Sequence, residues 1–116
     1  MANPDTASED HRRQSRLEIQ DNIPVTNLHT GEIIGQLANL SSEGLMISSR
    51  FAIDSGTTYQ VTIPITVEGD SEITISLGAE SLWTENSNQN GIYFTGFYII
   101  DISPEHHAIL DRLLSQ

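Results

Sequence analysis

The sequence predicts an all-β fold, a β-barrel or half-barrel, that ends in a single α-helix. Apolar and polar residues alternate along several short segments, and turn residues separate these segments at regular intervals. An amphipathic stretch with a helix start signal then closes the chain. Short strands with regular turns are typical of small barrels. The expected strands are 23–28, 32–40, 44–49, 58–67, 72–83 and 91–100.

Length and composition indicate one small domain. The 116 residues can enclose a single core, and the small, polar residues 1–10 are expected to form a disordered tail before a domain of residues 11–116. The absence of cysteine excludes a disulfide framework and a thiolate metal site. No apolar run approaches the ~20 residues of a membrane span. The N-terminus also lacks the features of a secretory signal, so a cytoplasmic protein is expected.

The clearest alternation lies in the strands expected at 58–67 and 72–83. The first has an apolar side formed by Tyr59, Val61, Ile63, Ile65 and Val67. The second has an apolar side, interrupted by Ser81, that is formed by Ile73, Ile75, Leu77, Ala79 and Trp83. Pro64 cannot donate to a strand ladder, which indicates a sheet edge or a bulge. Residues 92–100 are apolar on both faces, so this strand is expected to be covered on both sides.

The C-terminal helix is expected at about residues 104–114. Ser103 is a candidate N-cap, Pro104 fits the first helical position, and Glu105 favours the positive end of the helix dipole. An apolar stripe follows, formed by Ile109, Leu110, Leu113 and Leu114. A helix of roughly 11 residues is marginal alone, so this one is expected to dock on the sheet and cover its last strand.

The basic residues are few and lie mainly near the N-terminus. The chain has no lysine, and three of its five arginines, Arg12, Arg13 and Arg16, lie within five positions. The net charge of −11 argues against DNA, RNA and anionic membranes as partners, since these bind broad basic surfaces. The cluster instead indicates a local site for one small anion. A planar guanidinium grips a phosphate or a guanine edge with two parallel hydrogen bonds.

A second polar cluster lies at residues 39–44. Strand alternation is expected to place on one side Ile33, Gly35, Leu37 and Asn39. Ser41 continues that side while Leu40 turns inward, so two short hydrogen-bonding side chains project together from the strand end. Gly44 is expected to adopt a positive φ in a sharp turn. Successive N–H groups of such a turn can bind an anion.

The two clusters together resemble the signature of the PilZ domain family. Arg12 and Arg16 have the spacing R-x-x-x-R, and residues 39–44 have the pattern [D/N]-x-S-x-x-G after a further 22 residues, 17–38. The similarity runs from about residue 11 through nearly the whole chain. It also includes Leu82, Trp83, Gly91, Gly96, Phe97 and the run 101–104.

The resemblance implies a six-stranded antiparallel β-barrel with a flexible N-terminal arm and a site for the bacterial second messenger cyclic di-GMP. It implies that Arg12 and Arg16 bind guanine edges and phosphates, with Arg13 as a further cationic contact. Asn39 and Ser41 would bind a guanine and nearby phosphate oxygens. Asn39 replaces the commoner Asp and brings no charge, so its bond should be weaker. The implied set is completed by Gly44 and Trp83, the latter either a core residue or a stacking surface, while His11 leaves the stoichiometry open.

The leading hypothesis is a non-enzymatic cyclic di-GMP receptor without a cofactor. Its arm would close on the ligand and create a surface for an unidentified downstream protein. The resemblance implies control of motility, biofilm formation or exopolysaccharide. One alternative is a PilZ-like interaction module that binds no nucleotide. Another is a small hydrolase, which would need inward-facing carboxylates that the clear alternations do not provide. No metal site is expected, because the adjacent His106 and His107 point to different sides.

Overall fold

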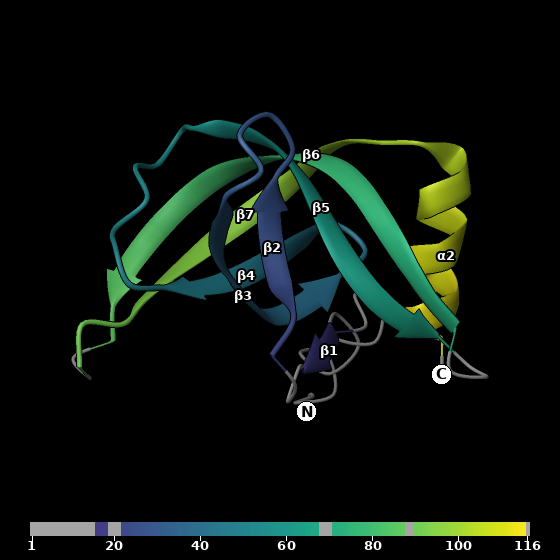
Figure 1. The fold of residues 1–116 in the computed structure, drawn as a ribbon, viewed down its shortest axis with the longest axis horizontal. Coiled ribbons are helices and arrows are strands. Elements are labelled where there is room, and N and C mark those ends of the chain that lie inside the picture. The colour runs from purple at the N-terminus through teal and green to yellow at the C-terminus, as the bar shows by residue number, and fades with distance from the viewer. Residues whose placement is uncertain (1–15, 19–21, 68–70, 88–89, 116) are drawn as a thin grey trace, which may run out of the picture.

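The computed structural model describes residues 16–18, 22–67, 71–87 and 90–115. Within these ranges the chain forms strands and one C-terminal helix (Figure 1), which confirms the predicted all-β class with a terminal helix. The predicted tail of residues 1–10, and the arm up to residue 15, lie outside the described residues. The elements are β1 Arg16–Glu18, β2 Pro24–Asn27, β3 Ile33–Ser41, β4 Gly44–Ser49, β5 Thr58–Val67, β6 Ser71–Asn86, β7 Tyr93–Ile102 and α2 Pro104–Leu114.

Six of the strands form a closed antiparallel barrel. They follow the order β3-β2-β5-β6-β7-β4, and pairing between β3 and β4 closes the sheet on itself. This confirms the six-stranded barrel that the resemblance implies. The short strand β1 is an addition to it. It pairs with the C-terminal end of β3, whereas β2 pairs with the N-terminal part of that strand.

The core fills the inside of the barrel with apolar side chains from β2 to β7 and from α2. The largest fully buried apolar side chains are Val25, Leu40, Ile47, Val61, Ile63, Ile75 and Leu110. Each such aliphatic side chain stabilises the fold by about 1.5–3 kcal/mol through its removal from water. Because the core takes apolar residues from one face of each strand, it sets which face of β3 and β4 is left for binding.

The helix α2 packs against β6 (Figure 1). The Ser103 hydroxyl accepts a hydrogen bond from the backbone N–H of His106 at 3.1 Å, as expected of an N-cap. Nδ1 of His106 in turn accepts the backbone N–H of Ser76 in β6, also at 3.1 Å. Leu110 and Leu113 then join the core. No helix in the described ranges combines the length and the apolar character that crossing a membrane requires.

Two register shifts in β3 make the predicted face of this strand wrong. Ile33 is 56% exposed, whereas Leu37 is 2% exposed, although strict alternation would place both on one side. One shift lies opposite Val25 and Thr26, and the other lies between Leu37 and Asn39. An extra residue in one strand of a pair moves the following side chains to the other face. The second shift therefore turns Asn39 outward while Leu37 stays in the core.

A register shift also corrects the predicted face of β6. The shift between Ser81 and Trp83 leaves Ser81 buried and Trp83 43% exposed, so Trp83 is not a core residue. The Ser81 hydroxyl donates to the Asp54 carbonyl at 2.5 Å and accepts from the Thr57 backbone N–H at 2.9 Å. The polar interruption in the apolar pattern thus holds the loop between β4 and β5 against the barrel.

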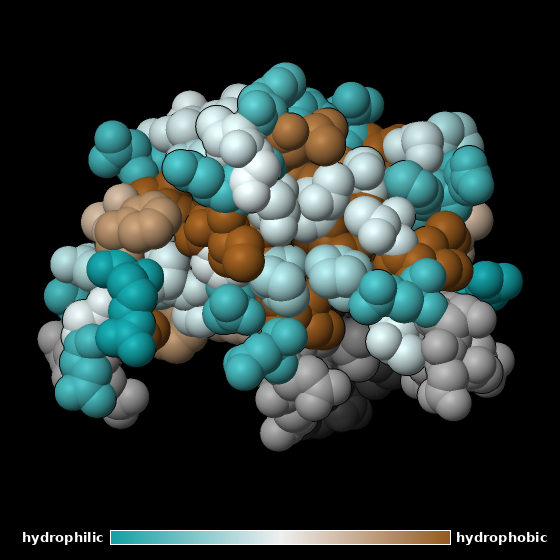
Figure 2. Space-filling view, in the orientation of Figure 1, coloured by the Kyte–Doolittle hydropathy of each residue, from teal (hydrophilic) through white to brown (hydrophobic). Residues whose placement is uncertain are grey.

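The prediction that β7 is covered on both sides is wrong. Tyr98 and Ile100 are 49% and 46% exposed, because α2 packs against β6 and leaves the outer face of β7 open. Apolar side chains also reach the surface elsewhere, in patches between hydrophilic residues (Figure 2).

The predicted edge position of Pro64 is confirmed. In the described part of the chain, β5 pairs with β2 only through Val61 and Thr62, so the residues after them have a ladder partner on one side, β6. Pro64 lies in this half-paired segment, opposite Thr74 of β6. On its other side no described strand needs a hydrogen-bond donor, so a residue without an N–H group is tolerated there.

Candidate functional site

The short strand β1 brings the two predicted clusters together. Its antiparallel pairing places Arg16 directly opposite Ser41 and Glu18 opposite Asn39. Residues opposite each other in an antiparallel pair have Cβ atoms about 4.5–5.5 Å apart. The second arginine of the R-x-x-x-R spacing is therefore a direct neighbour of the polar turn. Arg12 and Arg13 lie outside the described residues.

Ser41 holds the turn between β3 and β4. Its Oγ lies 3.2 Å from both the carbonyl oxygen and the amide nitrogen of Gly44, so the hydroxyl donates to the first and accepts from the second. A hydroxyl has one proton and two acceptor sites. In this turn Ser41 keeps one acceptor site, which suits a guanine or guanidinium N–H. To donate to a phosphate oxygen it must release the Gly44 carbonyl.

Asn39 offers the unused polar groups of the site. Its side chain is only 8% exposed, and it has no hydrogen-bond partner in the described ranges. A primary amide carries two donors and one acceptor oxygen, so Asn39 matches the mixed donor and acceptor edge of a base. Since β3 is shifted between Leu37 and Asn39, this amide lies outside the core, on the same surface as Ser41.

Gly44 has a different role from the predicted one. The described glycines with a positive φ are Gly31, Gly56 and Gly91, so the predicted left-handed turn at Gly44 is wrong. A Cβ at Gly44 would lie 2.3 Å from the Phe97 carbonyl oxygen in β7. A glycine is therefore needed at this position because β4 and β7 approach each other closely, and not because of its backbone angles.

These residues line a shallow cavity of about 140 Å³. The structure brings together here four of the predicted site residues, Asn39, Ser41, Gly44 and Trp83. The sequence analysis did not assign the other lining residues to the site, although three of them, Leu82, Gly96 and Phe97, belong to the family resemblance. The remaining two are Leu45 and Met46. They come from β4, β6 and β7, and only the barrel register brings them to one place. In the part of the chain that the structure describes, no group of three His, Asp or Glu residues could hold a metal ion.

Trp83 lies against the backbone of Gly96, its cross-strand partner. A Cβ at Gly96 would lie 2.4 Å from Cε2 of the indole, so the ring occupies the space that any other side chain would need. This close contact limits the positions open to the ring at the edge of the cavity. A large, partly exposed aromatic ring beside Asn39 and Ser41 can stack on a flat ligand.

Replacing Gly96 with alanine is expected to displace Trp83. The added methyl group would overlap the indole, so the ring must leave its position on β7. Trp83 is the single tryptophan of the chain, so its emission maximum should shift to longer wavelength as water reaches the ring. The control is Ser42→Ala, which adds no atom at a half-buried position outside the cavity lining, and the emission should stay unchanged. Unaltered emission in Gly96→Ala would contradict the contact.

Comparisons with known proteins agree with this architecture. A family model described as "PilZ domain" matches residues 10–116. No curated protein matches the chain. Among solved structures, the inhibitor of motility MotI/DgrA from Bacillus subtilis is similar, with a TM-score of 0.72 and 15% identity over 90% of this chain. The match covers 49% of the B. subtilis chain, so the present chain spans about half of that protein.

Two isolated PilZ domains are similar over most of their length. The PilZ domain of YcgR from Escherichia coli, solved with c-di-GMP, has a TM-score of 0.63 and 16% identity, covering 90% of this chain and 88% of its own. The PilZ domain of CeSA from a cellulose-synthesizing bacterium has a TM-score of 0.56 and 18% identity, covering 86% and 94%. At these identities the structures show a shared fold, whereas the family model matches nearly the whole sequence. The chain belongs to the PilZ domain family.

Proposed function

We propose that this chain is a cytoplasmic, non-enzymatic receptor for cyclic di-GMP that signals to a separate downstream protein. PilZ domains are receptor or adaptor modules, and the similar YcgR domain is described with this ligand. The observation that carries the proposal is the β1–β3 register, which sets Arg16 opposite Ser41. An arginine near one end of the chain is thus the cross-strand neighbour of a polar turn about 25 residues later, and Ser41 of that turn lines the small cavity.

The chemistry of the proposed site suits a guanine dinucleotide. Guanine presents O6 and N7 as a paired acceptor that a guanidinium can bind with two hydrogen bonds. Asn39 supplies a free amide, Ser41 supplies one acceptor site, and the Trp83 ring supplies a flat surface. In this proposal Arg12, Arg13 and Arg16 bind the phosphates and base edges, while Asn39 and Ser41 bind a guanine.

Energy considerations indicate that both halves of the site are needed. Ordering residues 12–15 on the ligand would cost on the order of 4–8 kcal/mol, whereas Arg16 is already paired in β1. Three charge-assisted arginine contacts at roughly 1.5–3 kcal/mol each only about offset this cost. Tight binding therefore needs the additional contacts of Asn39, Ser41 and Trp83. Closure of the arm on the ligand would be the switch that creates a new surface for the downstream protein.

A ligand titration tests the proposal. Cyclic di-GMP at 100 times its dissociation constant should stabilise the protein by about 2.7 kcal/mol against thermal unfolding. The emission of Trp83 should change with the same saturation curve, because the ring borders the cavity. GTP and cyclic GMP are the comparison ligands and should have far smaller effects. Equal stabilisation by all three nucleotides, or none by cyclic di-GMP, would contradict a specific receptor.

The second candidate function is a PilZ-like interaction module that acts without nucleotide. The observation that favours it is the exposure of three large apolar side chains from β6 and β7, namely Leu82 at 55%, Tyr98 at 49% and Ile100 at 46%. Exposed apolar residues of this size are common at protein interfaces. An absence of any nucleotide effect in the titration above would support this second function. In that case no control over motility, biofilm formation or exopolysaccharide would depend on the messenger.

A further inference from the structure

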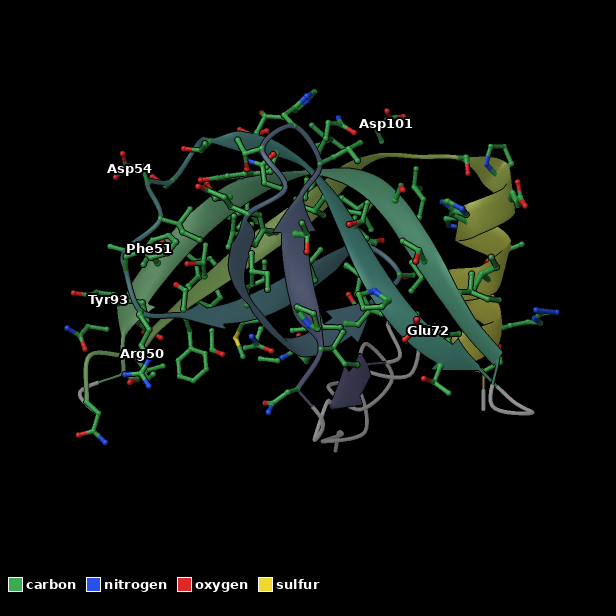
Figure 3. All side chains as sticks on the ribbon, in the orientation of Figure 1. Arg50, Phe51, Asp54, Glu72, Tyr93 and Asp101 are labelled. Atoms are coloured by element: carbon green, nitrogen blue, oxygen red, sulfur yellow. The ribbon has the colours of Figure 1, made fainter. Side chains whose placement is uncertain are left out.

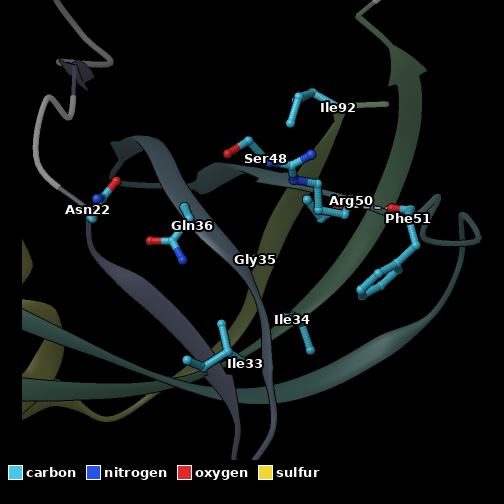
Figure 4. A pocket seen from close by; sticks show the side chains of 10 residues that line it. Asn22, Ile33, Ile34, Gly35, Gln36, Ser48, Arg50, Phe51 and Ile92 are labelled. Carbon is cyan, nitrogen blue, oxygen red and sulfur yellow. Dashed lines mark hydrogen bonds between the residues drawn. The ribbon is translucent and has the colours of Figure 1, made fainter. Parts of the chain in front are cut away.

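A second and larger cavity lies at the other end of β3 and β4. It has a volume of about 480 Å³, within the usual range for ligand pockets (Figure 4). Its walls come from the start of β3, the end of β4 with the loop that follows, and the residue before β7. Arg50 and Phe51 lie at the end of the barrel opposite α2, near Tyr93 (Figure 3). The cavity shares no lining residue with the one that Asn39 and Ser41 border.

Five side chains in the lining of this cavity carry hydrogen-bond donors, and the Ser49 hydroxyl already donates to the Phe51 carbonyl. The other four are Asn22, Gln36, Ser48 and Arg50 (Figure 4). The Arg50 guanidinium has one contact, Nη1 at 3.5 Å from the Asn90 carbonyl, and no described carboxylate lies within 4.0 Å of it. The Ser48 hydroxyl has no partner in the described ranges. Gln36 Oε1 is buried without a hydrogen-bond partner. Oε1 is an acceptor and cannot bind an anion, so only the N–H groups of Gln36 can contact one.

Apolar side chains form the rest of the wall. Ile33 is 56% exposed and Phe51 is 51% exposed, and Ile92 also belongs to the lining. Large apolar residues at this level of exposure leave area that a ligand can cover. The cavity therefore combines one cation, several neutral donors and an apolar surface, which is the combination expected for an amphipathic monoanion.

Charge distinguishes a carboxylate from a phosphate in this position. Arg50 is the single formal cation in the lining, and the chain as a whole carries −11. A phosphate monoester carries close to two negative charges at neutral pH and is generally bound by several cations or by a helix N-terminus. A carboxylate carries one charge, and its two oxygens match the planar fork of an arginine. The cavity therefore favours a carboxylate.

We propose that this cavity docks a peptide segment of a partner protein in which a carboxylate lies next to an apolar side chain. Arg50 binds the carboxylate, Ser48 and Gln36 add hydrogen bonds, and the apolar side chain rests on Ile33 and Phe51. The partner is taken to be the downstream protein, and in that respect the proposal rests on the proposed function. The carboxylate can belong to a chain terminus or to an internal aspartate.

Two small probes test the docking site by nuclear magnetic resonance. N-acetyl-phenylalanine represents a chain terminus, and N-acetyl-aspartyl-phenylalaninamide represents an internal aspartate. At least one of them should shift the backbone amide signals of residues 35–36 and 48–51, with a dissociation constant of about 1 mM for a ligand of this size. The probe that binds more tightly identifies the source of the carboxylate. If neither probe shifts these signals at 10 mM, the proposal is overturned.

Variants and comparison ligands make this test specific. Arg50→Gln should weaken binding of the better probe about tenfold. Arg112→Gln, which removes an exposed arginine of α2, should leave that binding unchanged. N-acetyl-phenylalaninamide lacks the carboxylate. Its affinity for the unaltered protein should be as low as the affinity of the better probe for the Arg50→Gln variant. Equal binding of this amide to the unaltered protein, or tighter binding of GMP at the same signals, would overturn the proposal.

The result can be separated from the fate of the proposed function. Cyclic di-GMP should shift the signals of Asn39, Ser41, Gly44 and Trp83, which line the other cavity. If the messenger does not bind and the carboxylate probe does, the receptor function fails while the docking site stands. If the messenger binds and neither probe does, only the docking site fails.

Discussion

Replacing Arg16 with alanine is expected to weaken cyclic di-GMP binding about 100-fold, which corresponds to about 2.7 kcal/mol. The residue lies opposite Ser41 in the β1–β3 ladder, so it is the described arginine closest to the polar turn. Its loss would remove a bidentate, charge-assisted contact to guanine or phosphate, and such hydrogen bonds contribute roughly 1.5–3 kcal/mol each. Isothermal titration calorimetry measures the change in affinity directly.

The matched control for this variant is Arg112→Ala. Arg112 is an exposed arginine in the last turn of α2, outside both cavities. It removes the same formal charge from the chain, so it separates a local contact from the general attraction of an anion. Affinity for cyclic di-GMP should stay within about twofold of the unaltered protein. If both variants lose affinity to the same extent, Arg16 is not a direct ligand contact.

Replacing Gly44 with alanine is expected to lower the free energy of unfolding by about 1–3 kcal/mol and to weaken ligand binding as well. The added Cβ would lie 2.3 Å from the Phe97 carbonyl oxygen, a backbone atom that cannot turn away. Strands β4 and β7 must therefore separate at this point, and the turn that Ser41 holds must move with them. Denaturant unfolding gives the stability, and amide signals of Phe97 and Tyr98 report the local change.

Ser42→Ala is the control in the same turn. Ser42 is half-buried, and its side chain has no hydrogen-bond partner in the ranges that the structure describes. Its replacement should change stability by no more than about 0.5 kcal/mol. A Gly44→Ala protein as stable as Ser42→Ala would mean that β4 and β7 are farther apart than the structure shows.

Local sequence patterns predicted much of the fold. The strands β4 and β5 begin and end at the predicted residues, because turn residues border them on both sides and their alternation is regular. The helix α2 spans Pro104–Leu114, since Ser103 and Pro104 supply a strong start signal. The closed barrel was expected from the family resemblance. The alternation alone did not distinguish a barrel from a half-barrel.

The face of the sheet on which each side chain lies was predicted less well where the strands are irregular. Alternation alone assigned Leu37 and Asn39 to one side, and it assigned Trp83 to the apolar side of β6. In both strands a register shift reverses the assignment. Such shifts depend on which residue pairs across the sheet, and this pairing involves segments far apart in the sequence. A single strand read by itself contains no signal for them.

The candidate site was only partly predictable for the same reason. The spacing of Arg12, Arg16, Asn39 and Ser41 points to the two clusters, and their ligand roles remain predictions. Contact between the clusters arises from β1, a strand of three residues that is too short to show any periodicity. The close approaches at Gly44 and Gly96 likewise involve β7, whose position follows from the closure of the barrel.

Pro64 has a consequence for the behaviour of this protein at high concentration. The segment of β5 around it has an open side, and an open strand side can recruit the same strand from another molecule. Proline supplies no N–H for such an intermolecular ladder, so it protects the barrel against edge-to-edge aggregation. A barrel whose candidate site depends on a precise strand register is thereby kept from exchanging strands with its neighbours.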